Sequence, residues 1–113
     1  MNTDVYKALS DENRLRIINI LMKKELCVCE IEAILNMSQS NVSRHLNKLK
    51  AADIVTSRKE SQWAFYTLSD KFIRDNVYLY EHLQKSLIKD EQLNEDVAKL
   101  SALEILPKCG GQK

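Results

Sequence analysis

The chain has few residues that interrupt a helix, with only two glycines and one proline among 113 residues. This scarcity favours a mostly helical protein with short connections. No apolar run approaches the roughly 20 residues that a membrane-spanning helix needs, so we expect no membrane contact. The first residues are not a basic region followed by an apolar stretch, so no secretory signal is predicted and the expected location is the cytoplasm.

Cysteine is also scarce, and its number is odd: the chain has three. This fits a compartment in which thiols stay reduced. Cys27 and Cys29 are too close along the chain to form an unstrained disulfide with each other. A dithiol oxidoreductase, the candidate of another class, needs a Cys-x-x-Cys motif or a phosphate loop on a βαβ unit, and neither pattern is present. We therefore expect no enzyme.

The length and composition predict one modest domain. Apolar residues make up 44% of the chain, which is enough for a core. A domain of this size buries only about 60–70% of the surface of its unfolded chain, so dimerisation would add stability. We expect a single domain over residues 1–105 and a flexible tail over residues 106–113.

Residues 28–51 have the pattern of two short helices joined by a tight turn. Apolar residues recur at helical spacing over residues 28–35 and again over residues 39–51. Ser38 is a strong N-cap for the second helix. Because the second helix is polar on its outer side, the pattern predicts a helix-turn-helix.

The flanking segments complete a fold that is mainly α with one β-hairpin. Residues 54–68 hold two runs of β-branched and aromatic residues on either side of a polar segment, residues 58–62, which predicts the hairpin. One unbroken helix is expected from Asp70 to Ile88, with Ser69 at its N-terminus. Shorter helices are expected over residues 4–9, from Asp11 onward, and over residues 91–105.

The positive charge is concentrated on the helix-turn-helix and the hairpin, although the formal net charge is only +1. Residues 38–60 hold five basic and two acidic side chains, whereas residues 70–100 hold five basic and seven acidic ones. A local positive excess on a helix-turn-helix predicts contact with DNA phosphates.

Four segments in order, residues 8–17, 25–30, 38–46 and 63–68, resemble motifs of the ArsR/SmtB family of metal-responsive repressors, most closely its arsenic-responsive branch. The resemblance implies a homodimeric winged helix-turn-helix repressor that releases its operator when a metal or metalloid binds. It also implies that helices near the two ends of the domain, above all residues 70–88, form the dimer.

The chain departs from the family pattern at several positions. Glu32 stands where arsenic-responsive members often carry a third cysteine, and residues 1–26 lack the cysteine of cadmium and lead sensors. Zinc sensors of the family carry Asp and His ligands along the dimer helix, and of these the expected dimer helix has only His82. Ser61 replaces the usual glycine at the hairpin turn, where glycine adopts positive φ more easily.

The thiols in residues 25–30 are the predicted inducer site. Soft thiolates select soft ions, and the expected inducer is As(III) or Sb(III), bound by Cys27, Cys29 and, as a third ligand, Cys109. Cadmium or lead sensing and thiol oxidation remain alternatives. We expect Cys27 to take the N-cap position of a capping box with Glu30, where the helix dipole would favour its thiolate. On a regular helix residues i and i+2 point roughly 200° apart, so we expect binding to distort the first helical turn.

The expected DNA contacts lie on the second helix of the pair and on the hairpin. By resemblance and geometry, Gln39 and Arg44 should read bases in the major groove of an inverted-repeat operator. His45 is expected to be hydrogen-bonded inside the domain rather than to contact DNA. The full set of predicted DNA-binding residues is Ser38, Gln39, Ser40, Asn41, Ser43, Arg44, Lys48, Arg58, Lys59 and Gln62.

Overall fold

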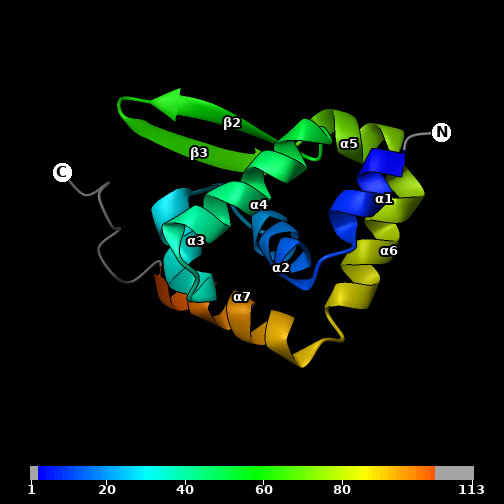
Figure 1. The fold of residues 1–113 in the computed structure, drawn as a ribbon. Coiled ribbons are helices and arrows are strands. Elements are labelled where there is room, and N and C mark those ends of the chain that lie inside the picture. Colours follow the sequence, from blue (N-terminus) through cyan, green and yellow to red (C-terminus); the bar gives the residue numbers. More distant parts are fainter. Residues whose placement is uncertain (1–2, 104–113) are drawn as a thin grey trace.

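The computed structural model describes residues 3–103, which form a group of helices with a small sheet at one end (Figure 1). The expected helix-turn-helix and the expected hairpin are both present. No helix within residues 3–103 is long and apolar enough to cross a membrane. The elements in order are α1 (Thr3–Leu9), α2 (Glu12–Leu21), β1 (Leu26–Cys27), α3 (Val28–Leu35), α4 (Gln39–Ala51), β2 (Val55–Glu60), β3 (Trp63–Leu68), α5 (Asp70–Asp75), α6 (Val77–Leu87) and α7 (Glu91–Leu103).

The helix-turn-helix begins and ends where its caps require. The side-chain oxygen of Ser38 accepts a hydrogen bond from the backbone N–H of Asn41, so α4 starts at Gln39 as predicted. Asn36 ends α3 in the left-handed conformation (φ 56°), which asparagine tolerates well. One side of α4 is fully buried in the core. The residues of that side are Val42, Leu46 and Leu49.

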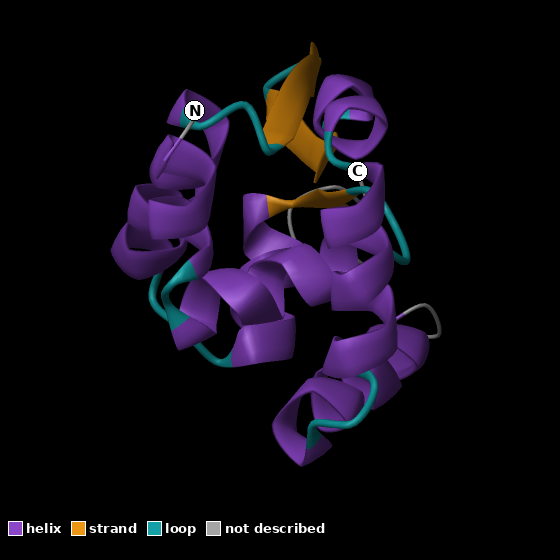
Figure 2. Ribbon diagram, turned by 90° about the vertical axis from the view of Figure 1, so that its right-hand side faces the viewer, coloured by secondary structure: helices purple, strands orange, loops and turns teal. Residues whose placement is uncertain are grey.

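The sheet has three antiparallel strands in the order β1-β3-β2, one more than the sequence predicted. The additional strand, β1, is only two residues long, and it pairs Leu26 with Tyr66 and Cys27 with Phe65. A two-residue strand has no alternation that could be read from sequence. The strands lie together at one end of the molecule (Figure 2). Through β1, the segment that carries Cys27 is hydrogen-bonded directly to the hairpin.

The hairpin strands are longer than expected, so the turn is tighter. Strands β2 and β3 pair as far as Glu60 with Trp63, leaving only residues 61–62 in the turn. Arg58 and Lys59, expected between the strands, are therefore paired strand residues. Ser61 takes the positive φ (61°) that a tight hairpin turn needs and that glycine would adopt without steric cost.

The expected unbroken helix over residues 70–88 is interrupted at Asn76, so this prediction was wrong. Asn76 has φ −133° and ψ 48°, outside the helical region. Its backbone N–H and its side-chain Nδ2 both donate to the carbonyl of Phe72, the latter at 3.1 Å. A side chain that competes for a helical acceptor in this way ends the helix. Helix α5 stops there, and α6 starts in a new direction.

Helix α7 lies across α2 and α3 and is fixed to α2 by buried polar groups. Arg16 donates from Nε to Asp96 Oδ2 at 2.9 Å and from Nη2 to Asp96 Oδ1 at 3.1 Å, and Asp96 is fully buried. The same Nη2 donates to the carbonyl of Leu35, the last residue of α3, at 3.3 Å. Asn19 donates to the carbonyl of Leu93 at 3.1 Å. The C-terminal helix is thus linked to the helix-turn-helix through Arg16.

Candidate nucleic-acid interface and thiol pocket

The outer side of α4 presents polar side chains to solvent. Of the predicted DNA-binding residues, all are exposed except Ser43, which is partly buried. Arg44 Nη2 donates to Asn41 Oδ1 at 2.9 Å, so its guanidinium lies along the helix surface. Since these side chains occupy one helix face and the adjacent hairpin, they can meet one side of a duplex together.

Arg58, a predicted DNA contact on β2, is neutralised by two carboxylates. It donates from Nε and Nη2 to both oxygens of Glu25, at 3.0 and 2.9 Å, and from Nη1 to Glu60 at 3.0 Å. Its guanidinium carbon also lies 4.9 Å from the centre of the Phe65 ring. The hydrogen bonds to Glu25 raise the pKa of Arg58 most, and the hydrogen bond to Glu60 raises it further. Nothing in the sequence predicted Glu25 as its partner, because the two are far apart along the chain.

His45 is buried on the inner side of α4 and contacts α2, as expected. Its Nδ1 lies 3.3 Å from Arg14 Nη1, within hydrogen-bonding distance. Asp11 caps α2 by accepting from the backbone N–H groups of Asn13 and Arg14, at 2.8 and 3.1 Å. Burial lowers the pKa of His45, and Arg44, Arg14 and Lys48 act in the same direction, whereas Asp11 opposes them.

This burial predicts a loss of stability in acid. As the pH falls below about 6.5, the histidine of the unfolded chain binds a proton before the buried one does. The unfolded state then holds more protons, so the free energy of unfolding decreases as pH falls, by at most about 1.4 kcal/mol per pH unit. Urea unfolding at pH 7.5 and pH 5.5 measures the change. His45→Gln should flatten this dependence, and His82→Gln, at an exposed position on α6, should not.

Cys27 is the N-cap of α3, and it lies outside the helix. Its backbone is extended (φ −91°, ψ 167°), and its N–H donates to Glu30 Oε1 at 3.0 Å. With the Cys27 sulfur facing the backbone N–H of Glu30, this is the predicted capping box. Burial raises the pKa of the Cys27 thiol above its usual value, and the backbone N–H groups of Glu30 and Cys29, which act in the direction expected for a helix N-terminus, offset this only in part. A soft ion that binds Cys27 must therefore displace a proton.

Both cysteines of the 25–30 segment line one pocket of about 270 Å³ between the start of α3, the start of α4 and the hairpin. Since Cys27 precedes the helix, the 200° separation expected for two helical positions does not apply. The side chains of Cys27 and Cys29 therefore line the same space without distortion of a helical turn. The remaining lining residues are Val28, Glu32, Gln39, Gln62, Trp63 and Ala64.

The pocket is not a complete metal site within the part of the chain that the structure describes. Residues 3–103 contain no group of three or more cysteine, histidine or acidic side chains arranged to hold a metal ion. The third predicted ligand, Cys109, lies outside the described residues, as do the tail and the end of the helix expected to reach residue 105. Sequence reasoning placed Gln39 and Gln62 on the DNA-binding surface but did not predict that they would also line the thiol pocket.

Comparison with known proteins supports the same reading of the fold and the motifs. Residues 11–57 match the family described as "Bacterial regulatory protein, arsR family". The chain is 38% identical over 96 residues to the arsenic resistance transcriptional regulator ArsR2 of Pseudomonas putida, covering 84% of this chain and 81% of that protein. It is 42% identical over 66 residues to the cadmium resistance transcriptional regulatory protein CadC of Listeria innocua, covering 58% and 56% of the two chains.

Solved structures agree on a winged helix-turn-helix. HlyU from Vibrio cholerae superimposes with a TM-score of 0.62 at 38% identity, covering 72% of this chain and 88% of that chain. A homodimeric winged helix-turn-helix DNA-binding domain from Mycobacterium bovis gives a TM-score of 0.60 at 28% identity, with 74% and 82% coverage. HlyU of Vibrio cholerae is a transcriptional activator by name, and another relative, from Synechocystis sp., is named a transcriptional repressor SmtB homolog, so the similarity includes regulators that act in opposite directions on transcription.

Proposed function

This chain belongs to the arsR family of DNA-binding bacterial regulators, which are not enzymes, and we propose that it is a homodimeric repressor that releases operator DNA on binding As(III) or Sb(III). The observation that carries the proposal is the shared pocket. Cys27 and Cys29 line it together with Gln39, the first residue of α4, and Gln62 in the hairpin turn. An ion held by the two thiolates therefore lies against two side chains of the proposed DNA surface.

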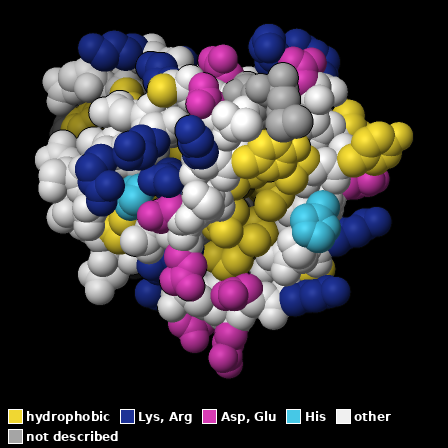
Figure 3. All heavy atoms as spheres, turned by 45° about the vertical axis from the view of Figure 1, so that its right-hand side comes forward, with side chains coloured by type: hydrophobic (Ala, Val, Ile, Leu, Met, Phe, Trp, Pro, Cys, Tyr) yellow, Lys and Arg dark blue, Asp and Glu magenta, His cyan; other side chains and the backbone are white. Residues whose placement is uncertain are grey.

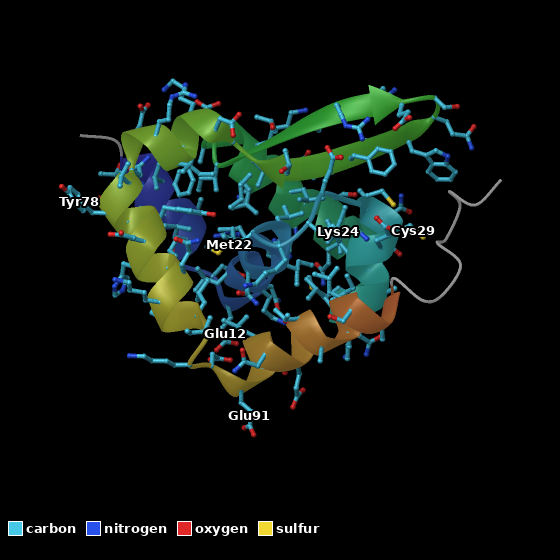
Figure 4. All side chains as sticks on the ribbon, turned by 180° about the vertical axis from the view of Figure 1, so that it is seen from behind. Glu12, Met22, Lys24, Cys29, Tyr78 and Glu91 are labelled. Carbon is cyan, nitrogen blue, oxygen red and sulfur yellow. The ribbon has the colours of Figure 1, made fainter. Side chains whose placement is uncertain are left out.

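The ligand set that we propose is Cys27, Cys29 and Cys109. Two thiolates select soft ions over calcium or magnesium. Cys109 lies six positions after Leu103, the end of α7, a length that spans up to about 20 Å when extended. Helix α7 contacts α3, and in Figure 4 it ends on the same side of the molecule as Cys29. Supply of the third thiolate by the same subunit fits this arrangement.

Coupling between inducer and DNA follows from the pairing of β1. Cys27 is paired with Phe65 of the hairpin in the antiparallel sheet and is also the N-cap of α3. A metalloid that draws Cys27 and Cys29 together shifts both elements relative to α4. By linkage, the free energy by which inducer weakens DNA binding equals that by which DNA weakens inducer binding.

The proposed homodimer would cover an apolar surface on α1 and α6. Tyr6 is 58% exposed, Val77 52% and Tyr78 86%, which is unusual for large apolar side chains. Figure 3 shows apolar side chains gathered on this side of the molecule, and Figure 4 shows Tyr78 far from Cys29. A twofold dimer through this surface presents two copies of α4 to an inverted repeat, with half-sites about one helical turn apart or a multiple of it.

Cadmium or lead is the second candidate inducer, and Glu32 favours it. The Glu32 carboxylate lines the pocket with the thiols, and it would offset the charge of a divalent ion. A relative of this chain is a cadmium resistance regulator by name. Thiol oxidation is the remaining alternative, because it needs only a second cysteine within reach.

Titration of the operator complex with each ion separates these candidates. Fluorescence anisotropy of a labelled operator duplex would follow release by arsenite, antimonite, cadmium, lead and zinc, added in turn under a reducing agent. We expect arsenite and antimonite to release DNA at the lowest concentrations. Release by cadmium or lead alone would assign the second candidate. Release only by mild peroxide, added in a separate titration without the reducing agent, would assign thiol oxidation. If none of these releases the duplex, the proposed function is wrong.

Two variants of the proposed DNA surface should distinguish a residue that reads bases from one that binds phosphate. Arg44→Ala on α4 should weaken operator binding by about 1–3 kcal/mol and weaken binding to unrelated duplexes less, because an arginine that contacts a base distinguishes sequences. Lys59→Ala on β2 should weaken binding to all duplexes alike and reduce the salt slope by about 1. Affinities on both duplexes from 50 to 200 mM salt measure the difference. Equal losses for both variants on both duplexes would contradict these roles.

A further inference from the structure

A second basic surface lies next to the recognition helix, outside the positively charged segment that the sequence predicted. The last turn of α1 and the second half of α4 enclose a pocket of about 320 Å³, lined by Lys7, Arg14 and Lys48 among others. Figure 3 shows one group of Lys and Arg side chains around a histidine on the left of the molecule, and other basic side chains at its top and right. Lys7 and Arg14 are outside residues 38–60, so the charge pattern of the chain did not assign them to DNA.

Arg14 is fixed in place at this pocket. Its Nε donates to the carbonyl of Ala8 at 2.6 Å, and its Nη2 donates to the carbonyl of Lys7 at 3.4 Å. Its Nη1 lies 3.3 Å from His45 and 3.9 Å from Asp11, and its side chain is only 12% exposed. A charge held in this way loses no side-chain freedom when an anion approaches. The contacts also fix the end of α1, and with it Lys7, relative to α4.

Lys7 and Lys48 carry the available charge of this surface. Both are exposed, and within residues 3–103 neither forms an ion pair with a carboxylate, although Asp4 also lines the pocket. Arg58 on the hairpin differs, because Glu25 and Glu60 offset its charge. An exposed lysine without a carboxylate partner attracts phosphate more strongly than one that is already neutralised. Positive charge is therefore stronger beside α1 than the sequence indicated, and weaker on the hairpin.

We propose that Lys7, together with Lys48, binds a phosphate of the operator backbone on the α1 side of the recognition helix. Lys48 lies one turn after Arg44 on the same exposed side of α4, so the surface is continuous with the proposed DNA-reading face. Along α1, Lys7 directly follows Tyr6 of the proposed dimer surface. The contact gives affinity and register without sequence preference. This inference rests on the proposed function in DNA binding.

Salt-dependent binding tests the contact. Lys7→Gln should weaken binding to the operator and to an unrelated duplex by the same factor, about 3- to 10-fold near 0.15 M salt. It should also reduce the slope of log K against log salt by about 0.9, the value for one phosphate contact. Lys7→Arg should keep both values of the unmodified protein. The matched control is Lys99→Gln, which removes one exposed positive charge from α7, the helix farthest from the hairpin in Figure 1.

The outcomes separate this inference from the proposed function. The α1 contact would be overturned if Lys7→Gln had the same salt slope as the unmodified protein or as Lys99→Gln. That result would leave repression by the recognition helix intact. A loss confined to the operator would also overturn it, because that result indicates base reading. Failure of the unmodified protein to bind any duplex would overturn both. Release by arsenite should occur at the same concentration for Lys7→Gln, since Lys7 does not line the thiol pocket.

Discussion

Replacing Cys27 by serine should abolish inducer response while leaving the free protein able to bind its operator. We expect the apparent affinity for arsenite to fall at least about 100-fold, because residues that merely support a metal ligand already contribute 10–100-fold. Serine is a better N-cap acceptor than cysteine, and the backbone N–H at position 27 can still donate to Glu30. Helix α3 should therefore keep its start, and the variant should be as stable as the parent or more stable by up to about 1 kcal/mol.

Operator anisotropy with increasing arsenite measures this response, and urea unfolding shows whether the variant remains folded. Cys29→Ser should give the same loss, and Cys109→Ser tests the third ligand separately. Because burial raises the pKa of the Cys27 thiol, a divalent ion such as cadmium, which must displace thiol protons, should act at lower concentration at pH 8 than at pH 6. Arsenite should depend little on pH in this range, because its hydroxyl groups leave as water with the thiol protons. Normal release by a folded Cys27→Ser protein would remove the thiol pocket from the mechanism.

The second large effect is expected at the ion pair between α2 and α7. Asp96→Ala should lower the free energy of unfolding by about 3 kcal/mol, because breaking a buried pair leaves an uncompensated charge. Asp96 is fully buried and binds Arg16 through both carboxylate oxygens, and this pairing raises the pKa of Arg16. The loss should be accompanied by freer exchange of the α7 backbone amides, since the carboxylate joins that helix to α2.

Urea unfolding of three variants distinguishes a buried pair from a superficial one. Asp75→Asn breaks the exposed Lys71–Asp75 pair (3.1 Å) and should cost no more than about 0.5 kcal/mol. Arg16→Met combined with Asp96→Leu should recover most of the stability, because apolar replacement of both partners is often neutral or better. A loss at Asp96→Ala no larger than at Asp75→Asn would contradict the structural role of the pair.

Local signals in the sequence were sufficient to predict the helix-turn-helix. Ser38 defines the start of α4, and the apolar spacing along α3 and α4 defines which sides are buried. The burial of His45 was also predictable, because the residue lies next to the apolar side of α4. These features depend on residues within a turn or two of one another, and such interactions are largely encoded in the local sequence.

The features that the sequence did not predict depend on contacts between distant segments or on a single competing side chain. Strand β1 exists because Leu26 and Cys27 meet β3, about 40 positions later. The pairing of Arg58 with Glu25 depends on the same approach. The break at Asn76 comes from one side chain that takes a backbone acceptor, within a run whose apolar spacing is helical throughout. The predicted DNA-binding and inducer-binding residues remain predictions.

Gln39 and Gln62 line the thiol pocket and are also exposed on the proposed DNA surface. A substitution that enlarges the pocket for a different ion at either position also alters the face offered to bases or phosphates. Inducer preference and promoter preference are therefore difficult to redesign independently through these two glutamines. Changes at Val28 or Ala64, which line the pocket and are partly buried, offer a route to a biosensor of altered selectivity that keeps its original promoter.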